Sequence, residues 1–309
     1  MRRLMPLLLA ACGSRAAAPP PAAPPVAVDP RLAPGDHVVE LDQQALAYHV
    51  AGKGPVCIAW PGGPGLDAGY LRSPELERHA TVIYVDPVGT GRSARLDDPT
   101  GYGKRRYVED LEKLRAALGL ESPCLLGHSY GGLVVMLYAV TYPNRAGRLI
   151  LYDATPRVDA EFAAAAQIAM QRSRGAAWYS DATTAFSAQP TTDDEATQLL
   201  ARIAPLYFAD WNARSADYAA AIGRSRASAA PMTAPERPPY DVRVDLPKIT
   251  APALVLAGRH DFICGPGHAT EIANLILDAR LHVFEKSGHF AHLEEPAEFE
   301  RVVADFLEG

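Results

Sequence analysis

The sequence predicts an α/β fold: a mostly parallel, twisted sheet with helices on both faces and a helical cap inserted after the sixth strand. Short apolar runs that end at Gly or Pro alternate with segments of helical periodicity, as in sheets buried on both faces. An Ala-rich interval at residues 157–245 interrupts this alternation and has little strand signal. A Gly-x-Ser-x-Gly pentapeptide at residues 127–131 stands between an apolar run and a helix-like segment.

Composition places the chain among globular proteins large enough to bury a sizeable core. It has 309 residues, of which 48% are hydrophobic and 21% are charged, and its formal net charge is −6. An acidic chain without a basic stripe has no electrostatic footprint for nucleic acid, so no nucleic-acid partner is expected. No apolar run approaches the roughly 18 residues that a membrane-spanning helix needs.

The first 36 residues are predicted to serve export and attachment. Residues 1–11 combine a short positive start with an apolar stretch, which is typical of a bacterial export signal. Small residues precede Cys12, so we expect lipoprotein-type cleavage before Cys12 and acylation of its thiol; a secreted soluble protein is the alternative. Residues 12–36 are rich in Ala and Pro and favour an extended tether. The predicted protein faces the periplasm or the exterior, attached to a membrane only through that lipid.

The alternation of apolar runs and helical periodicity defines a core of residues 37–155 and 246–309, with a cap at 156–245. An insertion of this size exceeds a simple crossover, so we predict a helical cap over the C-terminal edge of the sheet, where doubly wound folds bind ligands. The predicted strands are 37–41, 45–51, 56–60, 81–85, 124–126, 148–152, 253–257 and 280–284, and the core helices are 107–118, 129–141, 269–276 and 296–307.

Ser129 is the predicted nucleophile. It is the serine of the pentapeptide 127–131, where glycines permit the tight strand-to-helix turn that exposes a hydroxyl group. The following helix directs backbone N–H groups at charge that develops on a bound carbonyl oxygen. The alternative is a packing turn with an inert serine.

A serine hydroxyl needs a base and an acid that orients the base, and this fold class places both downstream in the order Ser, Asp, His. Asp261 lies just beyond one predicted strand and His289 beyond the next, so we predict them as acid and base. Asp153, which also follows a strand, is the competing acid, and His292 is the competing base.

Two backbone N–H groups are expected to hold the oxyanion. One belongs to Tyr130, the residue after the nucleophile, and the other to the Gly-rich loop after the third strand. Gly63 is the predicted donor of that loop, with Gly62 as the next choice. A metal site that combines His289, His292 and Asp261 is disfavoured because these residues already have places in a serine mechanism, so no metal or organic cofactor is implied.

Cys57 and Cys124 lie in apolar, strand-like runs and are predicted to be buried core thiols. A disulfide between them requires their strands to be neighbours, a question that the sequence leaves open.

These motifs together resemble the α/β-hydrolase superfamily, and within it the proline iminopeptidase (prolyl aminopeptidase) family and the related tripeptidyl aminopeptidases. The resemblance covers roughly residues 37–155 and 245–309 and implies an α/β-hydrolase fold. Two positions depart from the iminopeptidase pattern, since Pro61 stands where that family has His and Val88 where it has Arg. The motifs that carry the resemblance are Gly62-Gly63-Pro64-Gly65, Asp86 with Gly89-Thr90-Gly91-Arg92-Ser93, residues 127–132, Gly258-Arg259-His260-Asp261 and Ser287-Gly288-His289.

The resemblance implies a serine hydrolase that acts by acyl transfer, and an aminopeptidase that releases N-terminal proline or a small residue is the leading prediction. An esterase, lactonase or amide hydrolase of a small carbon substrate is the first alternative. A hydrolase-like protein that binds a ligand without turnover is the second. The expected partner is therefore a small molecule or a short peptide. A cap carboxylate that faces Ser129 favours the peptidase, and a wholly apolar pocket favours the esterase.

Overall fold

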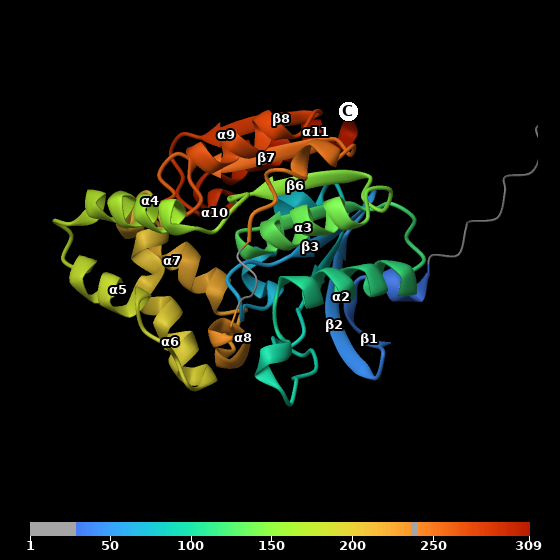
Figure 1. The fold of residues 1–309 in the computed structure, drawn as a ribbon, viewed down its shortest axis with the longest axis horizontal. Helices are drawn as coiled ribbons and strands as arrows, with labels where there is room; N and C mark the ends of the chain where they lie inside the picture. Colours follow the sequence, from blue (N-terminus) through green and yellow to red (C-terminus); the bar gives the residue numbers. More distant parts are fainter. Residues whose placement is uncertain (1–28, 236–239) are drawn as a thin grey trace, which may run out of the picture.

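The computed structural model describes residues 29–235 and 240–309. Eight strands form one sheet in the order β1-β2-β4-β3-β5-β6-β7-β8 (Figure 1). The β1–β2 and β2–β4 pairs are antiparallel and every other neighbouring pair is parallel, which confirms the predicted sheet. The strands are β1 Gly35–Leu41, β2 Gln44–Gly52, β3 Val56–Trp60, β4 Thr81–Val85, β5 Cys124–His128, β6 Arg148–Tyr152, β7 Ala253–Gly258 and β8 Ala279–Phe284.

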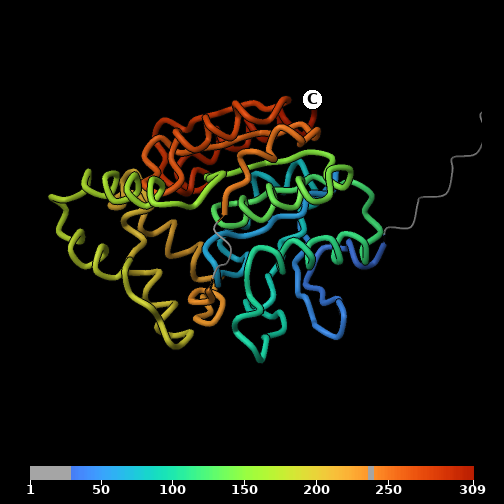
Figure 2. The backbone as a smooth tube through the Cα atoms, in the orientation of Figure 1, coloured from blue at the N-terminus to red at the C-terminus, as the bar shows by residue number. Residues whose placement is uncertain are grey.

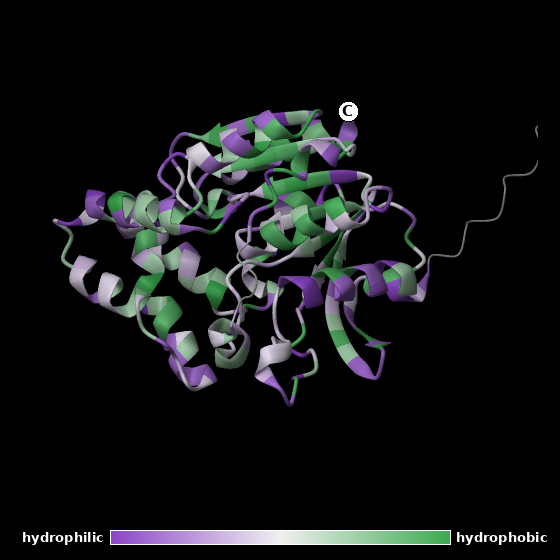
Figure 3. Ribbon diagram, viewed as in Figure 1, coloured by the Kyte–Doolittle hydropathy of each residue, from purple (hydrophilic) through white to green (hydrophobic). Residues whose placement is uncertain are grey.

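Helices cover both faces of this sheet, as predicted. Alternate residues of β3 illustrate the two faces: Ile58 and Trp60 belong to a core that includes α2, α3 and α9, while Cys57 and Ala59 pack with α1 and α11. Apolar residues therefore line the sheet on both sides (Figure 3). The helices of the core are α1 Pro74–Glu77, α2 Lys104–Ala117, α3 Tyr130–Thr141, α9 Pro266–Leu275, α10 Ala291–Glu294 and α11 Pro296–Glu308.

The ordered core begins earlier in the chain than the predicted boundary at residue 37. Asp29 accepts a hydrogen bond from the Arg31 N–H at 2.9 Å, and the Tyr48 hydroxyl donates to the Arg31 carbonyl at 3.1 Å. These contacts fasten the last part of the predicted tether to the sheet. The predicted signal 1–11 and Cys12 lie outside the described residues. Within the described ranges, no helix combines the length and apolarity needed to cross a bilayer.

Cys57 and Cys124 lie directly opposite each other, on the neighbouring strands β3 and β5. Both are buried free thiols, so this pair fills space in the core without a covalent link.

The cap lies between β6 and β7, and helices joined by loops make up its described part (Figure 1). Its helices lie beside the edge of the sheet where the parallel strands end, at the side of the molecule opposite β1 and β2. Phe208 and Tyr218 of the cap pack against Phe290 of the core. The cap helices are α4 Ala160–Met170, α5 Tyr179–Phe186, α6 Asp193–Ile203, α7 Trp211–Ile222 and α8 Ala229–Thr233.

The two chain segments that connect the cap to the core lie side by side (Figure 2). Arg157 on the outgoing segment forms an antiparallel bridge with Asp241 on the returning one. The Val158 N–H donates to the Tyr240 carbonyl at 2.8 Å, and the Val242 N–H donates to the Pro156 carbonyl at 3.0 Å. The cap is therefore joined to the core through one narrow double connection.

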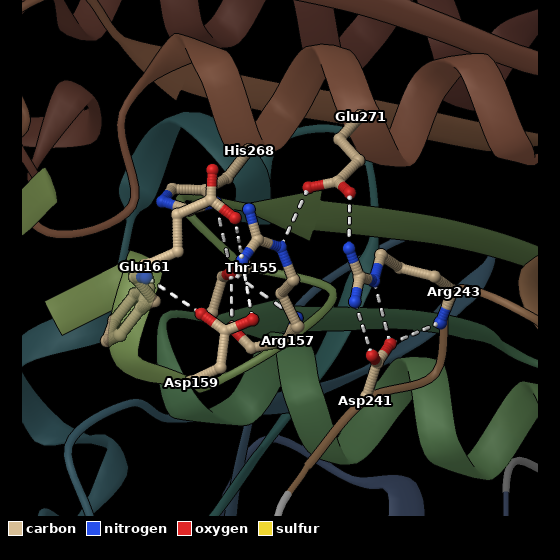
Figure 4. Close-up of polar contacts among 9 residues, drawn as sticks. Thr155, Arg157, Asp159, Glu161, Asp241, Arg243, His268 and Glu271 are labelled. Atoms are coloured by element: carbon tan, nitrogen blue, oxygen red, sulfur yellow. Dashed lines mark hydrogen bonds and ion pairs between the residues drawn. The ribbon is translucent and has the colours of Figure 1, made fainter. Parts of the chain in front are cut away.

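A cluster of ionised side chains fastens this double connection to α9 (Figure 4). The Arg157 guanidinium lies 2.5 Å from Asp159, 2.9 Å from Glu161 and 3.5 Å from Glu271 of α9. Glu271 also accepts from Arg243 of the returning segment at 3.4 Å. Arg157 is only 8% exposed and the Glu271 side chain 29%, so water screens this pair less than it screens a surface ion pair.

We expect Arg157→Gln to lower the melting temperature by several degrees, because the substitution leaves three carboxylates without their shared cation. Arg301→Gln is the matched control: this arginine also pairs with two carboxylates, Glu298 and Asp305, but its side chain is 56% exposed. Thermal unfolding followed by circular dichroism measures both variants. Equal, small shifts in the two variants would show that the Arg157 cluster contributes no more than an exposed pair.

Candidate active site

Ser129 occupies the sharp turn between β5 and α3. Its backbone has φ 55° and ψ −122°, a conformation that residues other than glycine rarely adopt. The Ser129 N–H donates to the Tyr152 carbonyl at 2.9 Å, which holds the turn against β6. A Cβ atom at Gly131 would lie 2.3 Å from the Trp60 carbonyl oxygen, so this position needs glycine. The strand, turn and helix around Ser129 are those that the sequence predicts.

Asp261 and His289 meet beyond the ends of β7 and β8. The His289 Nδ1 atom lies 2.7 Å from Asp261 Oδ2, and both side chains are buried. The other carboxylate oxygen, Oδ1, accepts a hydrogen bond from the Ile263 N–H at 2.9 Å. This geometry leaves the Nε2 edge of the His289 ring free to serve a second partner.

Asp261 is the ionised acid of this pair. Burial alone would raise its pKa, but the neighbouring His289 and the backbone N–H donors outweigh burial, and its pKa lies below the ordinary value. Asp153, the competing acid, is also buried and accepts a hydrogen bond from the Gly258 N–H at 2.8 Å. Burial and the charge of Asp261 raise the pKa of Asp153 well above its ordinary value. The carboxylate that accepts a hydrogen bond from the His289 imidazole is that of Asp261.

His128, inside the pentapeptide, links the oxyanion loop to the His289 backbone. Its Nε2 atom lies 2.9 Å from the His289 carbonyl, which can only accept, so Nε2 carries the proton. Its Nδ1 atom therefore accepts from the Tyr70 hydroxyl at 2.7 Å, and that hydroxyl accepts from the Gly62 N–H at 2.7 Å. Burial lowers the pKa of His128 well below its usual value, in agreement with this neutral form. The sequence signalled neither this relay nor Tyr70.

Tyr207 and Glu294 hold the loop that carries His289. The His289 N–H donates to the carbonyl of Tyr207, a cap residue, at 2.6 Å. The Glu294 carboxyl accepts from the Gly288 N–H at 2.6 Å and from the Ala209 N–H of the cap at 2.8 Å. Burial raises the pKa of Glu294 to about 7. Core and cap thus both position His289, a dependence that motif spacing does not reveal.

The two glycines proposed for the oxyanion loop differ in their surroundings. The Gly62 N–H is not available to a substrate oxyanion, because it already donates to the Tyr70 hydroxyl. Gly63, with φ 47°, lines the cavity that contains Ser129, and its N–H makes no hydrogen bond within the described residues. Tyr130 is the first residue of α3 and directly follows Ser129, the position predicted for the second donor. Gly63 and Tyr130 therefore remain the two candidate donors.

Ser129 and His289 line one small cavity of about 60 Å³ between core and cap. Their side chains are not joined by a hydrogen bond within the described residues, and such contacts often tighten only when substrate binds. Among the residues that the structure describes, no carboxylate lines this cavity. Its other lining residues are Gly63, Leu66, Tyr70, His128, Leu200, Ile203, Tyr207, Tyr218, Ile222 and Phe290.

Most acidic side chains of the cap are engaged elsewhere. Glu161 pairs with Arg157, Asp181 with Arg202 and Asp217 with Arg214. Asp193 pairs with Arg95. Glu195 and Asp210 accept hydrogen bonds from backbone N–H groups near the starts of α6 and α7. Glu236 lies outside the described residues.

His292 lies near His289 but does not share a partner with it. Its Nε2 atom donates to the Tyr70 carbonyl at 3.2 Å, and its Nδ1 atom accepts from the Tyr152 hydroxyl at 3.0 Å. Both ring nitrogens are therefore engaged in the protein core, and the site is not arranged for His292 to act as the base or as a metal ligand.

Comparison with known proteins agrees with this architecture. The family model described as alpha/beta hydrolase fold matches residues 57–296. A proline iminopeptidase of Heyndrickxia coagulans is 28% identical over 83% of this chain and 91% of its own length. A 2-hydroxy-6-oxo-2,4-heptadienoate hydrolase of Pseudomonas putida is 29% identical over 84% of this chain and 91% of its own length. The fold and these relatives define the protein as a hydrolase, and the chain belongs to the alpha/beta hydrolase fold family.

Solved structures share the fold at lower sequence identity. A hydrolase of Bacillus anthracis superposes with a TM-score of 0.69 at 22% identity and covers 87% of this chain and 98% of its own. An esterase of Thermogutta terrifontis gives a TM-score of 0.70 at 21% identity, with coverage of 88% and 98%. At such identities the likeness concerns the fold alone.

We expect His292 to make stability pH-dependent in acid. Burial lowers its pKa from 6.5 to about 4, so above pH 6.5 the histidine is neutral in both the folded and the unfolded protein. As the pH falls from 6.5 towards 4, the unfolded chain takes up a proton that the folded protein does not bind. The free energy of unfolding therefore falls by up to about 3 kcal/mol from this group.

Urea unfolding of the wild type and His292→Gln at neutral pH and at about pH 5 measures this contribution. The variant should lose less stability than the wild type between the two pH values. Glu294, whose raised pKa removes stability as the pH rises from 4.5 to about 7, is present in both proteins and cancels in the difference. His260→Gln changes an exposed histidine and serves as the control. An unchanged pH slope in His292→Gln would contradict the assignment.

Proposed function

We propose that the protein hydrolyses acyl compounds through a covalent intermediate on Ser129, with His289 as the base and Asp261 as the orienting acid. One observation carries this proposal: the base that is hydrogen-bonded to Asp261 lines the same cavity as the serine in the strained turn. This combination of an exposed hydroxyl, an imidazole and a buried carboxylate is what acyl transfer requires.

In this mechanism His289 Nε2 takes the Ser129 proton while the hydroxyl oxygen attacks the substrate carbonyl. Asp261 accepts from Nδ1–H and stabilises the imidazolium that forms. The N–H groups of Gly63 and Tyr130 hold the oxyanion of the tetrahedral intermediate. His289 then protonates the leaving group, and a water molecule, deprotonated by His289, releases the acyl group from Ser129.

We propose a neutral substrate with a compact, apolar acyl group, in an ester or amide. The cavity is small, and Leu66, Leu200, Ile203 and Ile222 supply much of its wall. A substrate amine would need an anionic partner, because an unpaired buried ammonium is costly. No described carboxylate lines the cavity, which favours the ester or amide hydrolase over the aminopeptidase.

An aminopeptidase that releases N-terminal proline is the second candidate. Relatives from Heyndrickxia coagulans and Lacticaseibacillus rhamnosus carry the name proline iminopeptidase, each 28% identical over 83% of this chain. A pyrrolidine ring is compact and apolar, in keeping with the cavity. Its amine would have to bind to the Tyr207 or Tyr218 hydroxyl, or to a carboxylate outside the described residues.

We expect Ser129→Ala to reduce kcat for 4-nitrophenyl acetate by about 10⁴- to 10⁶-fold, because the substitution removes the nucleophile. Ser180→Ala, in the exposed part of α5, should retain wild-type activity and is the matched control. Burst kinetics would detect the acyl-enzyme. Undiminished turnover by Ser129→Ala would overturn the proposed nucleophile, and ester turnover that requires Ser129 would dismiss a purely ligand-binding protein.

The same proteins tested on proline 4-nitroanilide separate the two candidates. Ester turnover without proline release would support the proposed hydrolase. Fast, Ser129-dependent proline release would replace it with the aminopeptidase. A series of 4-nitrophenyl esters measures how long an acyl chain the cavity admits. The acetate and butyrate esters should be better substrates than the decanoate ester, because the cavity is small.

We also propose that residues 1–11 direct export and that Cys12 receives a lipid, on the strength of the sequence pattern alone. Expression of the full chain in a bacterium that processes lipoproteins should place it in the membrane fraction. Cys12→Ser should shift it to the soluble fraction or leave it unprocessed. Equal membrane association of the two proteins would contradict lipid attachment at Cys12.

A further inference from the structure

A second cavity, of about 380 Å³, lies beside the active site and shares none of its lining residues. The 3₁₀ helix η2 (Ala68–Leu71) and its flanks separate the two cavities. Leu66 and Tyr70 line the cavity at Ser129, whereas Asp67 and Gly69 line the second one. Four arginines line this second cavity: Arg72, Arg92, Arg224 and Arg226.

The carboxylates of Asp67 and Asp86 in this second cavity bind main-chain groups. The two oxygens of Asp67 accept from the Gly69 N–H at 3.0 Å and the Arg226 N–H at 2.9 Å. Those of Asp86 accept from the Ala68 N–H at 3.3 Å and the Arg92 N–H at 3.2 Å. These carboxylates fix the loops around the cavity, and neither forms a hydrogen bond with a guanidinium group of the described residues.

Three of the arginines form no ion pair with a carboxylate of the described residues. Arg72 Nη2 lies 2.7 Å from His49 Nε2, and His49 Nδ1 in turn lies 2.6 Å from Asp36. Arg224 donates only to main-chain carbonyls, those of Gly69 at 3.2 Å and Ala220 at 3.1 Å. The Arg226 guanidinium makes no hydrogen bond within the described ranges. Arg92 alone has a carboxylate partner, Asp36 at 3.2 Å.

We propose that this second cavity binds the phosphate group of a small ligand. Several guanidinium groups with spare donors can engage more oxygens than one carboxylate offers, and a phosphate presents its oxygens in the geometry that guanidinium groups bind in pairs. The cavity is in the size range of small-molecule sites. The cavity is lined by four arginines and by three carboxylates, those of Asp36, Asp67 and Asp86, and among the described residues only Arg92 forms an ion pair with one of them.

The position of the cavity gives such a ligand access to the active-site scaffold. The Tyr70 N–H of η2 donates to Ser225 Oγ at 2.6 Å, and Ser225 lies between Arg224 and Arg226. The Tyr70 hydroxyl binds Gly62 and His128 at Ser129. A phosphate held by Arg224 and Arg226 therefore stabilises the segment that supports the oxyanion loop.

Isothermal titration calorimetry of the full chain with inorganic phosphate, at constant ionic strength maintained with chloride, tests the site without reference to catalysis. We expect saturable binding by the wild type. Arg226→Gln and Arg224→Gln should each weaken binding roughly ten- to a hundredfold, because each removes charge-assisted hydrogen bonds. Arg301→Gln, an exposed arginine of α11, should bind as the wild type does.

Arg226→Gln should keep the fold, because this guanidinium is exposed and makes no hydrogen bond with the described residues. Circular dichroism verifies that the variant is folded. Co-sedimentation with phosphatidylglycerol vesicles, against phosphatidylcholine vesicles, distinguishes the source of the phosphate. Binding to free phosphate supports a soluble ligand. Binding confined to phosphatidylglycerol vesicles and lost in both variants supports the same site with a lipid headgroup. Absence of both, or binding that both variants retain, overturns the proposal.

Discussion

The active-site architecture depends on one buried, neutral imidazole. His128 joins three segments that are far apart in sequence: the loop at Gly62, the helix η2 through Tyr70, and the backbone of His289. The relay in this form needs Nδ1 as an acceptor, because a proton on that atom would leave the Tyr70 hydroxyl proton without its partner. Burial prevents this by making the charged form costly. Desolvation thus keeps His128 neutral, and the His289 carbonyl, which accepts from Nε2–H, sets its tautomer.

The sheet supplies the second constraint, because parallel strands bring their C-terminal ends to one edge. Ser129, Asp261 and His289 follow β5, β7 and β8, and each reaches the same region although up to 160 residues separate them. The cap closes over this edge through the Tyr207 carbonyl and the Glu294 carboxyl, which both hold the His289 loop. Shape and apolarity at the cavity come mainly from the cap, whereas the reactive groups come from the core.

The parts predicted from the sequence are those with local signals. Alternating apolar runs, glycine-bounded turns and strand ends sufficed for the sheet, the cap and the turn at Ser129. Asp261 and Asp153 could not be separated with certainty, since both follow strands; only the three-dimensional distances and the charge of one acid beside the other distinguish them. Gly62 and Gly63 are equivalent as neighbours in sequence, and the Tyr70 hydroxyl decides between them. That contact, like the relay through His128, joins segments that are distant in sequence, and no local sequence pattern signals such a contact.

Because of the double connection at Arg157 and Asp241, the cap can be lengthened, shortened or exchanged in evolution without a change in the sheet. Because the outgoing and returning segments pair with each other, an insertion, deletion or exchange between them leaves the strand order and the spacing of β6 and β7 unchanged. Loop closure at that point needs no rearrangement of the sheet, and the entropic cost of a longer insert rises only slowly with its length. The walls of the cavity can therefore change with the cap, provided that the carbonyl at Tyr207 and the N–H at Ala209 continue to hold the His289 loop.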